Sequence, residues 1–380
     1  MTGPDTSRLV EVLANAPAPA RRLAIGLDAA RGLGVRGALR RRRDERALAA
    51  LGEAPWDAVY RRIWGEAAAE LGAELVELGD GFLELRRDGA RTRVWQQYTE
   101  LDGEVALRLA LHRRVVFEVL RDAGVGVPEH LEYTPGALAP ALAFVAASKD
   151  PCVVKPAAGT GVGSGITSGI RRPDQLRRAT LRASQYRRLL LERQVTGTVY
   201  RLLYLDGELL DAVRKLPPRV VGDGRSTVEQ LVAAENRRRL GARGAAGFSL
   251  LKLDLDALFT LEAAGLVPSS VPAAGEAVVV KSVTNQNRVE DNETVPRAEL
   301  AEALVAEGAA AAAAVGLRLA GVDVVTTDPG RPPAESGGRV IEVNGMPGLN
   351  HHYNVAEPDR AVRVAVPILA RLLEQDCRAP

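Results

Sequence analysis

Residues 339–348, which read RVIEVNGMPG, decide the fold class of this chain. The first half alternates as a β-strand does, and the two-residue period of a strand places Glu342 and Asn344 on the same face. Residues 321–325, GVDVV, set Asp323 among β-branched residues in the same way. Two carboxylates and an amide oxygen are hard ligands suited to Mg²⁺. We therefore predict that Asp323, Glu342 and Asn344 hold magnesium.

The alternative is that these polar residues occupy unrelated surface positions. For Asp323 alone that interpretation would be preferred. It does not suit Glu342 and Asn344, because an apolar strand seldom places two polar residues on one face without a partner.

A lysine followed by a glycine-rich turn lies in the middle of the chain. Residues 153–156, VVKP, predict a strand that delivers Lys155, and the turn after it contains Gly159, Gly161, Gly163, Ser164 and Gly165. Glycines let backbone N–H groups approach phosphate oxygens, and a lysine at the strand end neutralises phosphate charge. The turn lacks the ending of a Walker A loop, so a plain flexible turn is about as good an interpretation as a phosphate cradle.

Lysine is scarce in this chain, which is useful. Among 50 basic residues only five are lysine: Lys149, Lys155, Lys215, Lys252 and Lys281. A chain so biased toward arginine keeps lysine where a compact ammonium is needed, for example against a phosphate oxygen.

A third motif joins two expected strands, residues 189–194 and 201–204, through a turn that contains Gly197. This pattern predicts a hinge that holds an adenine against the backbone, with Arg201 placed to meet a developing phosphate. A surface hairpin is the alternative.

Helices and strands alternate along the rest of the chain, which predicts an α+β or α/β architecture in several subdomains. Residues 1–55 read as short helices, and residues 222–275 as an inserted, partly helical segment. The remaining expected helices are 56–71, 107–123, 299–315 and 361–374; the remaining expected strands are 74–78, 82–87, 92–95, 152–155, 277–282, 317–325 and 339–343.

The ordered set of motifs resembles the ATP-grasp superfamily, and most closely the ATP-grasp module of cyanophycin synthetase. The most specific local match is residues 222–231, GDGRSTVEQL, and the similarity covers roughly residues 75–360. The resemblance implies an ATP-grasp fold that holds the nucleotide between two α+β subdomains, with an extra N-terminal domain. We expect boundaries at 1–105, 106–190 and 191–380, with the insertion near 222–275.

The resemblance also implies a role for each matching residue. Lys155 and Arg113 would contact the ATP phosphates, and the backbone from Gly159 to Gly165 would close over them. The expected adenine pocket consists of Glu192, Arg193, Gln194 and Val195. Residues expected near the transferring phosphate are Arg201, Arg214 and Lys215. Candidate substrate contacts are Lys281, Asn285, Arg288, Gly348 and His351.

Several positions depart from the family's pattern. Val199 replaces an acidic residue, which leaves the ribose contact open, and Arg113 replaces a lysine. The loop 283–288 lacks the family's glycines, so we expect a changed substrate preference. His351 and His352 are also unusual, and they are open to a structural, a substrate-contacting or an acid–base role. Cyanophycin synthetase continues into a second ligase module, and this chain ends before it, so we expect a single ligation at one active site.

The resulting hypothesis is an ATP-dependent carboxylate–amine ligase whose expected cofactors are ATP and two Mg²⁺ ions. A small-molecule kinase on the same scaffold and a nucleotide-binding protein with weak catalysis are the alternatives. The net charge of +2 argues against a nucleic-acid partner. No stretch suggests a membrane span or a signal peptide, so we expect a cytoplasmic enzyme with small-molecule substrates, and a homo-oligomer by resemblance.

Overall fold

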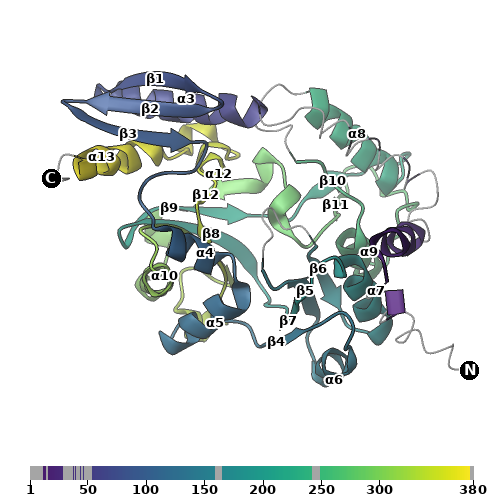
Figure 1. Ribbon diagram of the computed structural model, residues 1–380. Helices are drawn as coiled ribbons and strands as arrows, with labels where there is room; N and C mark the ends of the chain where they lie inside the picture. The colour runs from purple at the N-terminus through teal and green to yellow at the C-terminus, as the bar shows by residue number, and fades with distance from the viewer. Residues whose placement is uncertain are drawn as a thin grey trace, which may run out of the picture.

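The computed structural model describes residues 54–158, 165–241 and 249–376, together with 12–13, 16–28, 37, 39, 43 and 46. These residues form four antiparallel sheets with helices around them (Figure 1), which confirms the predicted α+β architecture. Of the short helices expected in residues 1–55, the structure describes a helix at 18–28, and most of that region lies outside the described residues.

The first sheet contains only strands that are close in sequence, in the order β1-β2-β3. Their bounds are Glu74–Gly79, Phe82–Arg87 and Ala90–Trp95. Helix α3 (Ala54–Leu71) packs beside the sheet and buries Ile63 and Trp64 fully, as its amphipathic pattern predicts. The last helix, α13 (Ala365–Asp376), returns from the other end of the chain to contact both α3 and β3. The N-terminal and C-terminal parts therefore share one core.

The second sheet has the strand order β4-β7-β5-β6. Its strands are His130–Tyr133, Leu189–Arg193, Cys152–Pro156 and Thr167–Ile170. Helices α6 (Ala139–Ala147) and α7 (Pro173–Ala183) bury Leu138, Leu176 and Ala179 with the strands in one core. The end of β5 thus delivers Lys155 at the edge of a well-packed body.

The third sheet is the largest, with the order β12-β9-β8-β13-β14. Its strands are Asn292–Thr294, Glu208–Lys215, Thr198–Leu205, Leu319–Thr326 and Arg339–Gly345. One face packs on α10 (Glu302–Val315) and α5 (Arg113–Asp122) through Tyr200, Leu202 and Tyr204. On the opposite face, Leu203 of β8 and Leu319 of β13 pack against the N-terminal core. Part of that second face stays polar, and the candidate site lies there.

A small fourth sheet closes off the predicted insertion. Strands β10 (Arg219–Val221) and β11 (Ala277–Val279) pair antiparallel, so the two ends of the inserted segment lie side by side. Between them are α8 (Val228–Gly241) and α9 (Leu255–Ala263). Short elements complete the described chain: α11 (Pro333–Ser336), α12 (Asn350–Tyr353), and the 3₁₀ turns Thr284–Gln286, Val289–Asp291, Arg297–Glu299 and Pro358–Arg360.

The structure corrects one predicted helix. Residues 107–123 form two helices, α4 (Glu104–Ala110) and α5, instead of one. The break falls at His112, whose backbone pairs with that of Ala158 beside the glycine-rich turn. Consequently Arg113 stands at the start of α5, and its backbone N–H donates to Ala157 O. The strand expected at 277–282 is also shorter, because it ends at Val279.

Candidate active site

A buried ion pair between neighbouring strands lies at the centre of the candidate site. Arg201 on β8 faces Asp323 on β13 across the ladder. Its guanidinium donates to both carboxylate oxygens, with 2.6 Å between Nη2 and Oδ2. A side chain at Gly321 would collide with Pro347, 2.9 Å away, and with Arg201, so this glycine makes room for both. The glycine of the sequence motif therefore has a packing role beside the acid.

The second predicted metal ligand lies directly beside the first. Glu342 on β14 is the cross-strand partner of Asp323. Its Oε1 is 2.7 Å from Nη2 of Arg113, whose Nη1 also donates to Pro156 O. Burial raises the pKa of Glu342, but the charges of Arg113, Lys155 and Arg201 outweigh burial and hold that pKa well below its ordinary value. Glu342 is therefore ionised at neutral pH.

The third predicted ligand, Asn344, follows two residues later on β14. Its Nδ2 donates to Gly321 O at 3.1 Å, which orients the amide. Within the described ranges, no cluster of three or more histidine, cysteine or acidic side chains is arranged to hold a metal ion. Asp323, Glu342 and Asn344 do lie together, as the sequence predicts, and arginines hold both carboxylates.

Lys155 connects the second and third sheets. Its Nζ is 2.7 Å from Oε1 of Glu192 on β7 and 3.5 Å from the backbone oxygen of Ile341 on β14. The ammonium also lies 5.6 Å from the ring centre of Phe117. Lys155 and Glu192 are both buried. The lysine predicted to bind phosphate therefore reaches the same place as the acidic strand residues.

Two further residues extend the cluster along the sheet. Lys215 ends β9, and its side chain is buried. Burial and the nearby charge of Arg201 lower the pKa of Lys215 to about 8, against the opposing effect of Asp323 and Glu342. His351 on α12 is affected in turn: burial and the charges of Lys215 and Arg201 lower its pKa well below the usual value. Gly348 lies close to the His351 ring, because a Cβ added at Gly348 would be 3.2 Å from His351 Cδ2.

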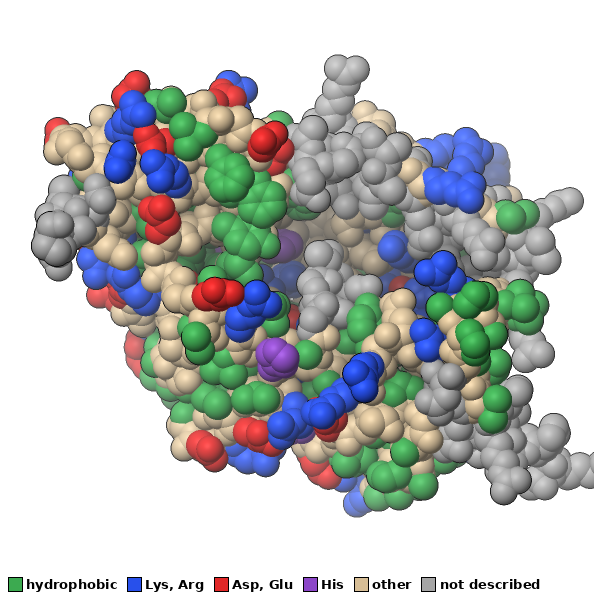
Figure 2. All heavy atoms as spheres, in the orientation of Figure 1, with side chains coloured by type: hydrophobic (Ala, Val, Ile, Leu, Met, Phe, Trp, Pro, Cys, Tyr) green, Lys and Arg blue, Asp and Glu red, His purple; other side chains and the backbone are tan. Residues whose placement is uncertain are grey.

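Figure 2 shows that the face of the molecule seen there is hollowed near its centre, with histidine and basic side chains visible inside the hollow. Gly159, Gly161, Gly163 and Ser164 lie outside the described residues, whereas Gly165 is described and has a φ of 81°. A side chain at Gly165 would press on Pro156 and Tyr186 at 3.0 Å.

The segment predicted to form the adenine pocket leads from one sheet to another. Strand β7 belongs to the second sheet and β8 to the third, so the alternative of a surface hairpin is excluded. Glu192 faces Lys155, whereas Arg193 pairs with Glu129 at 2.9 Å. Gln194 Oε1 accepts from Gly169 N. Val195 follows in the link between the sheets, which leaves the adenine contact a prediction.

The candidate substrate residues from the loop after β11 make polar contacts of their own. Lys281 is buried, and its Nζ is 2.8 Å from Asp254 Oδ2. Arg288 pairs with Asp291 at 3.2 Å, and the Asn285 backbone oxygen accepts from Ser249. These contacts stabilise the body that contains α8 and α9. The Arg288 backbone oxygen also accepts from Asn292 of β12, which is the cross-strand partner of Lys215. The substrate contacts of the three residues stay a prediction.

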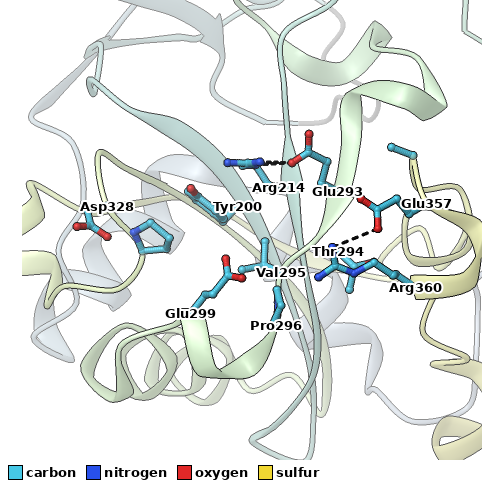
Figure 3. A pocket seen from close by; sticks show the side chains of 12 residues that line it. Tyr200, Arg214, Glu293, Thr294, Val295, Pro296, Glu299, Asp328, Glu357 and Arg360 are labelled. Carbon is cyan, nitrogen blue, oxygen red and sulfur yellow. Dashed lines mark hydrogen bonds and ion pairs between the residues drawn. The ribbon is translucent and has the colours of Figure 1, made fainter.

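Arg214 of β9 lies away from the cluster of Arg201 and Glu342. Adjacent strand residues point to opposite faces, so Arg214 and Lys215 diverge. Arg214 pairs with Glu293, with Nε 2.9 Å from Oε2, and lines a separate cavity of about 590 Å³ beside Tyr200 and Glu299 (Figure 3). We therefore leave Arg214 out of the candidate catalytic group.

Sequence reasoning missed one buried residue on the same face as Lys215. Asp211 of β9 lies 2.7 Å from Nδ1 of His352, and both side chains are buried. The alternation of residues 208–215, ELLDAVRK, could have revealed that Asp211 and Lys215 share a face.

Among the described helices, none is long and apolar enough to cross a membrane.

Comparison with known proteins supports the fold and the sequence resemblance. No family model matches the chain. A cyanophycin synthetase from Nostoc sp. is 30% identical over 282 residues, which cover 68% of this chain and 29% of that protein. A bifunctional glutathione biosynthesis protein from Pasteurella multocida is 28% identical over 263 residues, 67% of this chain and 34% of that protein. The chain thus spans about a third of the length of these curated relatives.

A solved structure shares the fold. The crystal structure of a bifunctional glutathione synthetase from Pasteurella multocida aligns with a TM-score of 0.52 at 23% identity, covering 84% of this chain and 44% of that one. Together with the motif order, this alignment identifies the architecture. The chain therefore has the ATP-grasp fold and is similar in sequence to cyanophycin synthetase.

Proposed function

We propose that this chain is an ATP-dependent ligase that joins a carboxylate to an amine through an acyl-phosphate. The observation that carries the proposal is the convergence of Lys155, Arg201 and Glu342 where the second and third sheets meet. Lys155 contacts the backbone of β14 beside Glu342, and Glu342 lies across from Asp323, the partner of Arg201. The named activities of the relatives, cyanophycin synthetase and glutathione biosynthesis, agree with this chemistry.

The charges of the cluster suit a polyanionic ligand. Four cationic side chains (Arg113, Lys155, Arg201 and Lys215) face three carboxylates (Glu192, Asp323 and Glu342). A positive charge is left over while Lys215 is protonated. A triphosphate entering such a buried site gains strong electrostatic interactions because the local dielectric constant is low. In this proposal Lys155 and Arg113 bind its phosphates.

The oxygen donors of the site fit magnesium. Glu342 Oε2 and Asn344 Oδ1 accept no hydrogen bond from the described residues. Both side chains are partly exposed. Asp323 stands beside them, held by Arg201. We infer that Glu342, Asn344 and Asp323 would hold Mg²⁺, and by resemblance two ions. When bound, Mg²⁺ supplies charge withdrawal from the β- and γ-phosphates.

The remaining chemistry falls to the cationic side chains. The substrate carboxylate attacks the γ-phosphorus, the new C–O–P linkage forms, and the bond to ADP breaks. The amine then attacks the acyl carbon, phosphate leaves, and the amine loses a proton. In this proposal Arg201 and Lys215 stabilise the transferring phosphoryl group and the leaving phosphate. Exclusion of water protects the acyl-phosphate from hydrolysis.

Other parts of the proposal rest on the resemblance. The substrates would be an amino acid or small peptide and a second small molecule. We also propose the subdomain boundaries given above, and a homo-oligomeric assembly. Light scattering on the purified chain tests the assembly, and a monomer at micromolar concentration would contradict it.

The experiment that tests the activity is a screen of amino acids in pairs, with ADP release and product mass both measured. We expect ADP release that needs an acid and an amine together, with a product mass equal to the two substrates minus water. A stable phosphorylated product formed without an amine would instead identify a kinase. Nucleotide binding without turnover for every pair would favour a protein with weak catalysis.

A further inference from the structure

Helix α12 (Asn350–Tyr353) is held by contacts from three separate elements. Asn350 Oδ1 accepts from Tyr60 Oη of α3 at 3.1 Å. The backbone oxygen of Asn354, just after α12, accepts from Asn292 of β12. His352 contacts Asp211 of β9. The helix therefore joins the N-terminal core to the face of the third sheet that carries the candidate site.

The contact between His352 and Asp211 is a buried polar pair. Nδ1 of His352 is 2.7 Å from Asp211 Oδ2, and His352 has no exposed surface. This hydrogen bond joins the imidazole Nδ1 to the Asp211 carboxyl group. Nε2 of the same ring is buried and has no partner within the described part of the chain. Burying these polar groups costs free energy that an apolar pair would not, so the pair calls for an explanation other than stability.

The neighbouring residue His351 supplies that explanation. Successive residues of a helix point about 100° apart, so one of the pair can reach β9 while the other faces the cluster. His352 contacts Asp211, and His351 lies within electrostatic reach of Lys215 and Arg201. Asp211 and Lys215 lie four residues apart on the same face of β9. The anchor and the candidate site therefore share one strand.

The start of α12 is also fixed. The turn that precedes it contains Met346, which has a φ of 61°, unusual for a residue other than glycine. Pro347 fits against Gly321 beside Arg201. With this end set by β14 and the turn, the orientation of α12 depends on its other contacts, of which Asp211–His352 is fully buried.

We propose that Asp211 and His352 are positioning residues, which orient α12 so that His351 lies against the substrate beside Lys215 and Arg201. This inference rests on the proposed function. It adds a role for His352 and for Asp211, which the sequence motifs do not include. In the proposed function Lys155 binds the ATP phosphates from the second sheet. We therefore expect changes to Asp211 or His352 to affect binding of the acid or the amine and not of ATP.

The test compares His352→Leu, which removes the hydrogen bond, with His352→Asn, whose amide can still donate near the position of Nδ1. Asp211→Asn and Asp211→Leu form the matching series on the partner. Tyr133→Phe is the control for general destabilisation, because it removes a buried 2.8 Å hydrogen bond to Thr180 elsewhere. All variants are made in the full chain, and thermal unfolding is recorded for each.

Two measurements are made on each variant. The first is steady-state kinetics with the acid, the amine and ATP varied separately. The second is NMR of imidazole-labelled protein without substrate, which is practical because the chain has only four histidines. In the wild type, burial and then the charges of Lys215, Arg201 and His352 lower the pKa of His351 well below its usual value. A displaced α12 would move His351 toward ordinary titration.

We expect His352→Leu to raise the KM for the acid or the amine about 10-fold or more, with the KM for ATP within about 2-fold, as misplaced substrate groups do. We expect His352→Asn to recover most of the loss and Tyr133→Phe to lower the melting temperature without this split. Unchanged kinetics, or an equal rise in every KM, would overturn the proposal. If no substrate pair supports ADP release, the proposed function fails, and the NMR arm decides alone: unchanged titration of His351 in His352→Leu would then overturn the positioning role.

Discussion

Arg201 and Asp323 face each other across β8 and β13 and form a bidentate ion pair, with 2.6 Å between Nη2 and Oδ2. Both side chains are buried, on the sheet face that also carries Glu342 and Lys215. Removing one partner of a buried pair leaves the other charged and unpaired. Stability measurements can therefore test this geometry independently of catalysis.

We expect Arg201→Met to lower the free energy of unfolding by about 3–5 kcal/mol, because Asp323 remains buried without its partner. The double variant with Asp323→Leu should recover a large part of that loss. Urea unfolding of the two single variants and the double variant measures the coupling. Strictly additive losses would show that the two residues do not interact as the structure places them.

Glu342 is the residue on which the metal assignment depends most. We expect Glu342→Gln to reduce ADP release by about 100-fold or more, because it removes a charge that would hold Mg²⁺. The amide can still accept from Arg113, so the fold should persist. Circular dichroism and thermal unfolding check this. Full activity in a folded Glu342→Gln protein would remove Glu342 from the metal site.

Lys215 and Arg214 are adjacent and differ in the face to which they point. We expect Lys215→Met to lower kcat by about 100-fold through the loss of a cation at the transferring phosphate. Arg214→Gln should stay within about 3-fold of the wild type, because Arg214 pairs with Glu293 at the separate cavity. The measurement is kcat of both variants in parallel with that of the wild type. The reverse order of effects would mean that the strand register or the site is misassigned.

Lys215 also predicts a pH dependence. Burial and Arg201 lower its pKa from the ordinary lysine value to about 8, so its positive charge is present below about pH 8 and is lost as the pH rises through that value. We expect kcat/KM, which reports on the free enzyme, to fall on the alkaline side near pH 8. Lys215→Arg, which stays protonated, should lose this fall while retaining some activity. An identical alkaline limb in Lys215→Arg would assign the titration to another group.

Lys155 gives a prediction for nucleotide binding. We expect Lys155→Met to weaken ATP binding by at least about 10-fold, because the ammonium meets phosphate in a buried setting. Lys155→Arg should also bind poorly, since a planar guanidinium does not fit the place of a compact ammonium between Glu192 and Ile341 O. Isothermal calorimetry with a non-hydrolysable ATP analogue measures both. Wild-type affinity in Lys155→Met would move the phosphate site elsewhere.

The sequence alone predicts the strands that carry the site, because their chemistry is local. Glu342 and Asn344 lie on β14, and Lys155 lies on β5, as their alternating patterns indicate. An alternating strand pattern that ends at a glycine can be recognised in the sequence without knowing which strands pair with it. The α+β architecture follows from the same alternation.

What the sequence does not predict depends on tertiary contacts. Arg214 and Lys215 look equivalent in a basic pair, and only the pairing of β9 with β8 decides which one faces Asp323. The break before Arg113 arises from the contact between His112 and Ala158, which are far apart in sequence. Asp211 and His352 are separated by 141 residues, and their contact depends on where α12 returns to β9.

The most direct test of the central claim follows one oxygen atom. A substrate acid labelled with ¹⁸O in its carboxylate is incubated with ATP and the amine identified by the screen, and the released phosphate is analysed by mass spectrometry. Attack of the carboxylate on the γ-phosphorus predicts ADP and phosphate that carries one ¹⁸O for each amide formed. Release of AMP and pyrophosphate, or of phosphate without the label, would contradict an acyl-phosphate made at this cluster.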